Sequence, residues 1–375
     1  MEDRSWVEEA WSKSAGKTMV NLRRIGAGFP HASKGGVYDL AGPEWWTAGF
    51  WPGMLWLFYG ESGSLEMKAA AEECEARLDK VLDGYVRLDH DLGFMWTLTS
   101  VANYKLTGSE ISRIRAMKAA NYLAARFNLN GRYIRAWNPW QEGEQNEGIA
   151  IIDCCMNIPL LFWATRISGD PRFAHIANAH MDTVLRHFIR EDGSVSHIIH
   201  FDAETGERIE SLGGQGYGPE SAWSRGSAWA IYGLALAYHH TGRDAYLTAA
   251  HRAANFFLSR LPEDQVPPWD FRAPEPLQKF KDSSASACAA SGLILLGEKT
   301  GGSEGAFYRA RGERILKSLY ESYGAWGNDN EEGLILHGTS NYPQGSNIDV
   351  PLIYGDYFFI EGLARLKDCG PFYWE

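Results

Sequence analysis

Cysteine is scarce in this sequence of 375 residues, and the five that occur show no spacing typical of a metal site or a disulfide framework. Their number is odd and no CxxC pair is present, so we expect small buried side chains in a reducing compartment. Lysine and arginine form no run, and the formal net charge is −11. A nucleic-acid-binding protein usually carries a basic stripe, so we expect no nucleic-acid partner.

Signals for membranes, targeting and cofactors are also missing. The first ten residues have neither a basic nor an apolar region, which argues against a signal peptide. The longest nearly apolar stretch, 148–165, contains Asp153 and Asn157, and a central Asp is costly in lipid. No P-loop, no GxGxxG after an expected strand and no metal-type cluster occurs. We therefore expect a cytoplasmic protein without membrane partner, metal or cofactor, as a monomer or a small homo-oligomer.

What the sequence does contain is a repeat. Six mostly apolar segments of about four helical turns each end near a glycine, which is the expected residue just past a helix. They are 45–59, 91–106, 149–167, 225–240, 282–299 and 349–367. An amphipathic segment follows each of the first five, and another opens the chain at 7–25. Because helices that are apolar all round are buried and amphipathic ones face water, the pattern predicts an all-α (α/α)6 barrel. We expect one catalytic domain over 1–375, although length alone favours two or three domains.

The long connections all precede apolar segments, at 129–148, 191–223, 262–281 and 324–348. In an alternating barrel these loops lie at one end, and such insertions usually form the binding face. The chain has 15 Trp, 17 Tyr and 17 Phe, whose flat faces suit sugar rings or bases. The mouth predicted in this way includes Trp46, His90, Asp91, Trp137, Trp140, Asp153, His197, Gln215, Arg225 and Trp229.

Two carboxylates in this set suggest catalysis. Asp153 is expected inside an apolar helix, and no Lys or Arg occurs between Arg135 and Arg166, so desolvation should raise its pKa as a general acid requires. The alternative is a buried Asp that caps another helix. Asp91 begins the neighbouring inner helix and is either catalytic or only an N-cap. Two carboxylates that face one aromatic pocket are typical of a glycosidase.

Other residues have simpler interpretations. Arg225, at the start of a helix, could bind a substrate carboxylate with both terminal nitrogens. Trp51 and Trp96 are expected in the core, and Asp282 and Asp349 are expected to be N-caps. His200 is equally compatible with a site or a plain surface position.

Several segments resemble the unsaturated glucuronyl hydrolases of glycoside hydrolase family 88, in order along nearly the whole chain. They are Trp46-Thr47-Ala48-Gly49-Phe50-Trp51, His90-Asp91-Leu92-Gly93-Phe94, Ile151-Ile152-Asp153-Cys154, Trp223-Ser224-Arg225-Gly226-Ser227-Ala228-Trp229, Trp269-Asp270-Phe271, Asp282-Ser283-Ser284-Ala285-Ser286-Ala287 and Tyr354-Gly355-Asp356-Tyr357. The resemblance implies an (α/α)6 barrel, which the repeat predicts independently.

The resemblance also implies a reaction and roles. This family removes the 4,5-unsaturated uronate that polysaccharide lyases leave at the non-reducing end of an oligosaccharide. An acid protonates C4, water adds at C5, and the hemiketal collapses with loss of the aglycone. By motif matching, Asp153 is the acid/base and Asp91 assists it. The matching also implies substrate contacts for His197 and Gln215, with Arg225 beside the substrate, His90 beside the catalytic Asp, and Trp46, Trp137 and Trp229 lining the subsites.

The match is not complete, and other functions stay open. Residues 44–51 lack the second Asp that the family often has, and no Ser-x-x-Ser-x-Lys pattern, used by some members for sulfated sugars, is present. An unsaturated rhamnogalacturonyl hydrolase acting on pectin fragments is the alternative enzyme. A sugar 2-epimerase would need several His at the site, and the 11 His are scattered. A non-catalytic carbohydrate-binding helical-repeat protein gains nothing from a cation-free buried acid.

Overall fold

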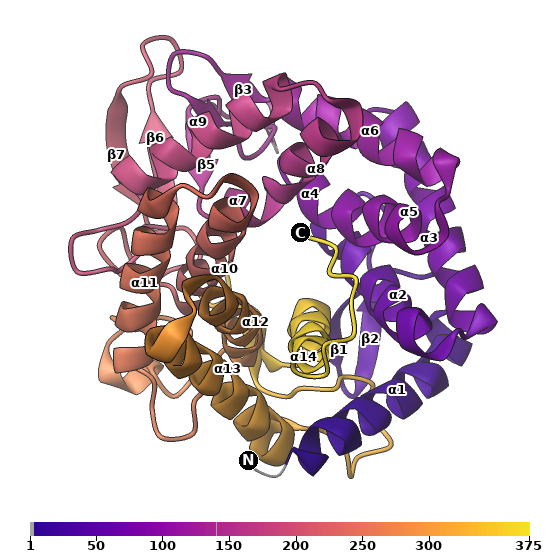
Figure 1. Ribbon diagram of the computed structural model, residues 1–375. Helices are drawn as coiled ribbons and strands as arrows, with labels where there is room; N and C mark the ends of the chain where they lie inside the picture. The colour runs from indigo at the N-terminus through magenta and orange to yellow at the C-terminus, as the bar shows by residue number, and fades with distance from the viewer. Residues whose placement is uncertain (1–3, 140) are drawn as a thin grey trace.

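Two concentric layers of helices form the molecule in the computed structural model, which describes residues 4–139 and 141–375 (Figure 1). Across these residues six inner helical units alternate with six outer helices, as the repeat predicts. The inner units are α2 (Phe50–Ser62), α4–η2–α5 (Leu92–Trp96, Thr97–Val101 and Ala102–Thr107), α7–α8 (Cys154–Asn157 and Pro159–Ser168), α10 (Ser224–Thr241), α12 (Ser283–Thr300) and α14 (Ile353–Leu366). The outer helices are α1 (Ser5–Ile25), α3 (Leu65–Asp83), α6 (Glu110–Ala125), α9 (Arg172–His187), α11 (Asp244–Ser259) and α13 (Gly302–Tyr323).

Glycines end the first four inner units, as expected. Gly63, Gly108, Gly169 and Gly242 follow these helices with φ between 67° and 75°, the left-handed conformation that glycine adopts without steric cost. The last inner helix differs, because α14 ends at Leu366 and is capped by Lys367 rather than closing at Gly370. On the outer layer, the Ser64 and Ser109 hydroxyls accept N–H bonds from the first turns of α3 and α6.

Two inner helices begin later than the sequence suggests. Residues 149–151 form strand β5 (Ile149–Ile151), and the helix begins at Cys154, so Asp153 precedes the helix instead of lying inside it. Similarly, Asp349 lies in strand β9 (Ser346–Val350) with φ 60°, and the prediction that it caps a helix is wrong. Apolar composition alone does not separate a buried strand from a buried helix, and here β5 pairs with a distant segment of the chain while β9 pairs with the strand just before it.

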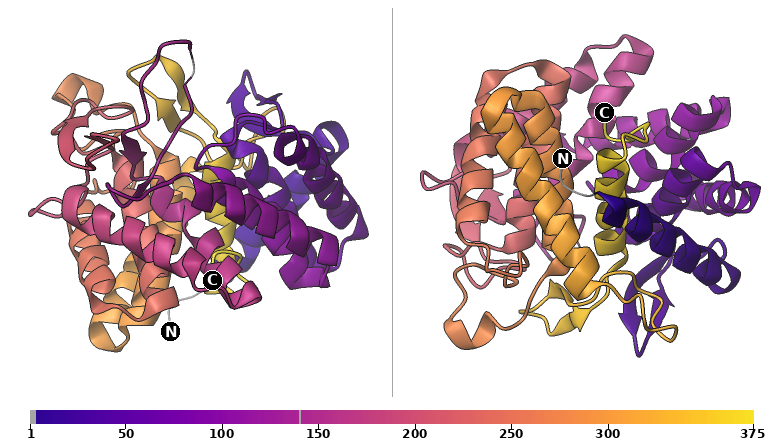
Figure 2. Two further views of the ribbon diagram at one scale, coloured as in Figure 1. Left: turned by 90° about the horizontal axis from the view of Figure 1, so that it is seen from above. Right: turned by 60° about the horizontal axis from the view of Figure 1, so that its bottom comes forward.

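All the strands precede inner helices, and they gather at one end of the barrel, opposite the C-terminus (Figure 2, left). The pairs are β1 (Pro30–Lys34) with β2 (Val37–Leu40), β3 (Phe127–Asn128) with β4 (Tyr133–Ile134), and β8 (Gly338–Asn341) with β9. A three-stranded antiparallel sheet joins β5, β6 (Ile198–Phe201) and β7 (Arg208–Leu212). This sheet ties the loop before α7 to the loop before α10, so the predicted mouth is built from paired segments.

The core is aromatic as well as aliphatic. Trp51 and Trp96 are 1% and 0% exposed, which confirms their expected place in the core. Near the C-terminus, Trp374 stacks on Phe358 with ring centroids 6.4 Å apart and is itself buried. All five cysteines are free, and four of them are buried. Among the described residues, no helix combines the length and the apolar character that crossing a bilayer requires.

Candidate active site

Asp153 stands directly before α7, at the inner end of strand β5. Its carboxylate is surrounded by protein, and this desolvation raises its pKa to about 7, while the charge of Arg225 acts in the opposite direction. Among the residues that the structure describes, none meets hydrogen-bond geometry with its buried Oδ2 atom, although the indole of Trp229 lies near enough to lower the pKa of Asp153 slightly. Buried polar atoms are almost always paired, so an unpaired carboxylate oxygen with a pKa near neutrality is suited to exchange a proton with a bound molecule.

Asp91 lies beside Asp153, immediately before α4. Within the described part of the chain its side chain accepts no capping bond from that helix, so the N-cap interpretation fails. Instead Asn157 Nδ2 donates to Asp91 Oδ1 at 3.2 Å, and Asn157 Oδ1 accepts the N–H of Phe94 at 2.7 Å. Burial raises the pKa of Asp91 well above its usual value, and the nearby carboxylates of Asp89 and Asp153 raise it further. The two catalytic candidates therefore form an interacting pair, as in many acid–base sites.

His197 connects Asp153 to the backbone of the mouth. Its Nε2 lies 3.6 Å from Asp153 Oδ2, and its Nδ1 lies 3.0 Å from the N–H of Gln215 and 3.2 Å from the carbonyl of Gly213. Burial lowers its pKa to about 3, so the ring is neutral. At 3.6 Å, His197 Nε2 and Asp153 Oδ2 are neighbours but are not hydrogen-bonded within the described structure. A proton on Nε2 makes this nitrogen a donor that faces the carboxylate, and a proton on Nδ1 makes it an acceptor. A backbone partner is in place for either tautomer.

Arg225, at the start of α10, is 2% exposed and engaged with protein groups. Its Nη1 donates to Asp282 Oδ2 and to the carbonyl of Thr339, and its Nη2 donates to Gln215 Oε1 at 2.8 Å and to the carbonyl of Ser340. All four terminal N–H groups are thus used. In this arrangement the guanidinium cannot also form the bidentate bond to a substrate carboxylate that the sequence suggests. It joins three mouth segments and places a positive charge near Asp153.

Asp282 accepts the Ser284 N–H at 3.2 Å, which confirms that it is an N-cap. The same carboxylate binds Arg225, so the cap also anchors the arginine. His200 pairs with Glu210 across β6 and β7, with His200 Nδ1 3.7 Å from Glu210 Oε1, where both side chains are partly exposed. It lies in the sheet that supports the mouth.

The tryptophans predicted at the mouth differ in burial. Trp46, in the turn η1 (Trp46–Gly49), packs on Tyr354 with centroids 4.9 Å apart and is partly exposed. Trp137 is also partly exposed and packs on the cluster formed with β5 and β6. Trp229 is 1% exposed and packs against Phe94 at 5.2 Å, so it is buried beside Asp153, whereas Trp46 and Trp137 are partly exposed. Trp140 lies outside the described residues.

His90 is fully buried next to Asp91, with Nε2 3.5 Å from Asp91 Oδ1. In the described structure both ring nitrogens lack a hydrogen-bond partner, as do His197 Nε2 and Trp229 Nε1. Burial holds the pKa of His90 well below its usual value, so this ring adds no charge. Several unpaired polar atoms thus converge where the two carboxylates meet.

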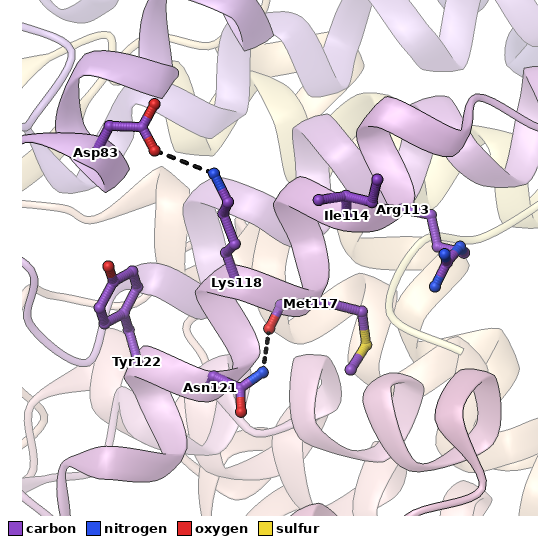
Figure 3. A pocket seen from close by; sticks show the side chains of 7 residues that line it. All are labelled: Asp83, Arg113, Ile114, Met117, Lys118, Asn121 and Tyr122. Carbon is purple, nitrogen blue, oxygen red and sulfur yellow. Dashed lines mark hydrogen bonds and ion pairs between the residues drawn. The ribbon is translucent and has the colours of Figure 1, made fainter.

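A cavity away from these residues lies on the outer wall along α6 (Figure 3). It has a volume of about 530 Å³ and is lined by Asp83, Arg113, Ile114, Met117, Lys118, Asn121 and Tyr122. Lys118 pairs with Asp83 at 3.1 Å in this cavity, and both groups are exposed, so it offers no desolvated acid. Throughout residues 4–139 and 141–375, no three His, Cys, Asp or Glu side chains are grouped closely enough to hold a metal.

Three residues that shape this site are not among those that the sequence predicts. Asn157 follows Asp153 by four residues, and that helical spacing was the available signal. Asp89 accepts the N–H of Asp91 at 2.9 Å, and burial raises its own pKa to about 6. Tyr354 is fully buried with its ring 5.2 Å from the Arg225 guanidinium. It lies in a motif that the resemblance uses, but nothing in the motif indicates its contact.

Comparisons with known proteins find relatives over nearly the full length, although no protein-family model matches the chain. The chain is 36% identical over 371 residues to an unsaturated glucuronyl hydrolase of Bacillus sp. (strain GL1), covering 98% of each protein. It is 35% identical to an unsaturated chondroitin disaccharide hydrolase of Streptococcus pyogenes serotype M1, over 98% of this chain and 93% of that protein. A solved UGL variant with dGlcA-Glc-Rha-Glc superposes with a TM-score of 0.92 at 35% identity, over 96% of each chain.

Proposed function

Since this chain belongs to the unsaturated glucuronyl hydrolase family, we propose that it is a glycoside hydrolase that releases the 4,5-unsaturated uronic acid from the non-reducing end of lyase-generated oligosaccharides. The observation that supports this most directly is the buried, unpaired Oδ2 of Asp153, whose pKa of about 7 lets it hold a proton at neutral pH. Hydration of a vinyl ether needs such an acid, because the slow step is protonation of carbon.

In the proposed mechanism Asp153 donates its proton to C4 of the unsaturated ring, which leaves positive charge on C5 and the ring oxygen. The ionised Asp153 then accepts a proton from the water that adds to C5, and the hemiketal opens with loss of the aglycone. In this proposal His197 presents a donor to the ionised Asp153 and an acceptor to the protonated one. It can change tautomer in this way because its Nδ1 has one backbone donor and one backbone acceptor within reach. The charge of Arg225 favours the ionised carboxylate after the transfer.

Asp91 takes the second role in this proposal. It lies close enough to Asp153 for the two carboxylates to affect each other, and each ionised carboxylate disfavours ionisation of its neighbour. One proton shared by the pair keeps one carboxyl group ready to donate and the other able to stabilise positive charge at C5. Trp46 and Trp137 offer partly exposed faces for the sugar rings, and Gln215 stands between His197 and Arg225.

The origin of the substrate follows from the relatives. One of them is named for chondroitin disaccharides, and we propose a glycosaminoglycan-type or related oligosaccharide for this chain too, with membership of glycoside hydrolase family 88. We further propose that residues 1–375 act as one catalytic domain, without cofactor, as a monomer or small homo-oligomer. Five free cysteines support a cytoplasmic location, since thiols stay reduced there.

A panel of lyase products tests the reaction. Unsaturated disaccharides made from glycosaminoglycans and from pectin are incubated with the enzyme, and the loss of the conjugated-uronate absorbance is followed. We expect turnover of glycosaminoglycan products. Preferred turnover of pectin products would indicate an unsaturated rhamnogalacturonyl hydrolase, and binding without any loss of absorbance would indicate a carbohydrate-binding protein.

The same assay tests Asp153. We expect Asp153→Asn to lower kcat by about 10² to 10⁴ with little change in KM, because a general acid acts mainly in the transition state. Asp182→Asn is the matched control. That carboxylate lies on the outer helix α9 and pairs with Arg243 at 2.7 Å, so kcat should stay normal. Normal turnover by Asp153→Asn would remove Asp153 from the catalytic role.

A further inference from the structure

Arg126 ends the outer helix α6 and extends its guanidinium between two mouth segments. Its Nε donates to the carbonyl of Arg135 at 3.0 Å, its Nη1 to the carbonyl of Leu88 at 2.8 Å, and its Nη2 to the carbonyl of Ala136 at 3.1 Å. Leu88 and Ala136 are 3% and 0% exposed. One side chain therefore satisfies backbone carbonyls of two separate segments, where an unpaired acceptor would be costly.

Three further hydrogen bonds connect the same two segments. Asn138 Oδ1 accepts a second bond from Arg126 Nη1 at 2.8 Å, while Asn138 Nδ2 donates to the carbonyl of Leu88 at 2.9 Å. The N–H of His90 donates to the carbonyl of Ala136 at 3.1 Å. Segments 88–91 and 135–138 are thus fixed to each other through Arg126 and Asn138, in addition to that single backbone bond.

Each segment carries a residue of the proposed site. The first ends in Asp91, and the second contains Trp137, whose face is partly open. We propose that Arg126 is a positioning residue, which holds Asp91 and Trp137 in register so that the unsaturated ring on the tryptophan face meets the carboxylate pair. This inference rests on the proposed function, because it assumes that both residues act on one substrate.

The charge of Arg126 acts at the same place. The titratable and charged groups that face Asp91 are Asp89, His90, Arg126, Asp153 and Cys154. Arg126 is the cation in this set, and it lowers the pKa of Asp91, while Asp89 and Asp153 raise it. His90 stays neutral. Removal of the guanidinium should therefore raise the pKa of Asp91 and move the corresponding limb of the pH–rate profile to higher pH.

Two variants separate geometry from charge. Arg126→Lys keeps the charge, but the small ammonium group cannot donate to all three carbonyls at once, as the planar guanidinium does. We expect kcat/KM to fall roughly 10- to 100-fold, with a rise in KM, and an unchanged pH profile. Arg126→Met loses the charge as well, so we expect a similar or larger loss of kcat/KM together with the shift to higher pH.

Arg115→Lys is the matched control, because Arg115 lies on the same helix and binds Asp79 at 2.6 Å and Glu75 at 3.5 Å. It should lower the melting temperature without changing KM or the pH profile. If Arg126→Met does not fold, Asn138→Ala removes the hydrogen bonds of Asn138 to Arg126 and to the carbonyl of Leu88 and keeps the guanidinium in place. We then expect a loss of kcat/KM without a pH shift.

Wild-type turnover of the unsaturated disaccharide is measured first, and its absence would contradict the proposed function rather than this inference. With an active wild type, the inference is overturned if the Arg126 variants match Arg115→Lys, with lower melting temperatures but normal kcat/KM and pH profiles. A pH shift in Arg126→Lys equal to that in Arg126→Met would also overturn it, since only the latter removes the charge.

Discussion

At the scale of single residues, Asp153 shows how catalysis and stability oppose each other. Its pKa is raised from 3.8 to about 7, so the folded state holds a proton that the unfolded chain releases from about pH 4 upward. The free energy of unfolding therefore falls as pH rises through this range, and the loss is complete above about pH 7. The buried carboxylate that suits acid catalysis thus weakens the fold at neutral and alkaline pH.

Asp153→Asn should remove this pH dependence. An amide of the same size does not ionise, so we expect the variant to gain stability over the wild type at pH 8, by at most about 4 kcal/mol. The gain should shrink toward pH 4, where the wild-type carboxyl group is protonated in both states. Thermal melts of both proteins at pH 4, 6 and 8 provide the measurement. A difference in melting temperature that is independent of pH would contradict the raised pKa.

Asp91 gives a second prediction at this scale. Its side chain makes no capping bond within the described structure, so Asp91→Asn should lose none of the roughly 0.5–2 kcal/mol that an N-cap provides. We expect the melting temperature to hold at acid pH and, because the pKa of Asp91 is raised, to stay at or above the wild-type value at neutral pH, while kcat collapses. Ser64→Ala is a suitable comparison, since Ser64 does cap α3 and should lose stability with normal kcat. An active and stable Asp91→Asn enzyme would refute the catalytic role.

At the scale of elements, the site depends on how closely two inner helices approach. Gly93 of α4 faces α7, and a Cβ at this position would lie 2.2 Å from Asn157 Cα and 2.4 Å from its carbonyl oxygen. Because these are backbone atoms, the clash with an added Cβ cannot be relieved by a change of side-chain rotamer. Only with glycine here can Asn157 bond both Asp91 and the N–H of Phe94. The close approach of α4 and α7 at Gly93 thus sets the distance between the carboxylates of Asp91 and Asp153.

Gly93→Ala should therefore push α4 and α7 apart. We expect a loss of stability of about 1–3 kcal/mol together with a marked fall in kcat, both measured on the purified variant. Gly60→Ala is the matched control in the neighbouring inner helix α2, where the nearest atom to an added Cβ is Leu106 Cδ2 at 3.5 Å. That variant should be active and as stable as the wild type or slightly more so. Equal behaviour of the two variants would show that the close contact is unimportant.

At the scale of the whole molecule, charge is the main constraint on binding. The net charge of −11 repels an anionic sugar at long range, so attraction has to come from close contacts inside the mouth. Arg225 supplies its charge there, although its terminal N–H groups are taken by protein acceptors. Its field acts at short range, where salt screens little.

This arrangement predicts a weak or slightly positive effect of salt. Between about 10 and 150 mM salt the screening length falls from roughly 30 to 8 Å, which reduces the repulsion but leaves close contacts intact. We expect kcat/KM to stay constant or rise modestly over this range. The methyl ester of the same disaccharide, which carries no charge, should show no such rise. A steep fall of kcat/KM with salt would indicate long-range attraction and contradict this account.

The repeat of apolar segments and glycines determined the barrel, because a helix that is apolar on every side has to be covered by other helices. The order of long connections also predicted the mouth. The lack of Lys or Arg close to Asp153 in the sequence indicated that it would resist ionisation, although in the fold the charge of Arg225 acts on it in the opposite direction. All of these predictions use residues that are close together in the chain. They required no knowledge of which segments meet.

Only the tertiary structure decided which groups meet across the chain. Strand β5 replaces a helical turn because β6 offers it hydrogen bonds from 50 residues away (Ile149 pairs with His200). The terminal N–H groups of Arg225 are all hydrogen-bonded to protein because Asp282, Thr339 and Ser340 converge on it. Arg126 reaches the segment that carries Asp91 because α6 ends beside that segment. Long-range pairing depends on distances between segments that a local pattern does not contain, so the carboxylate pair and its supports could be assigned only in the folded molecule.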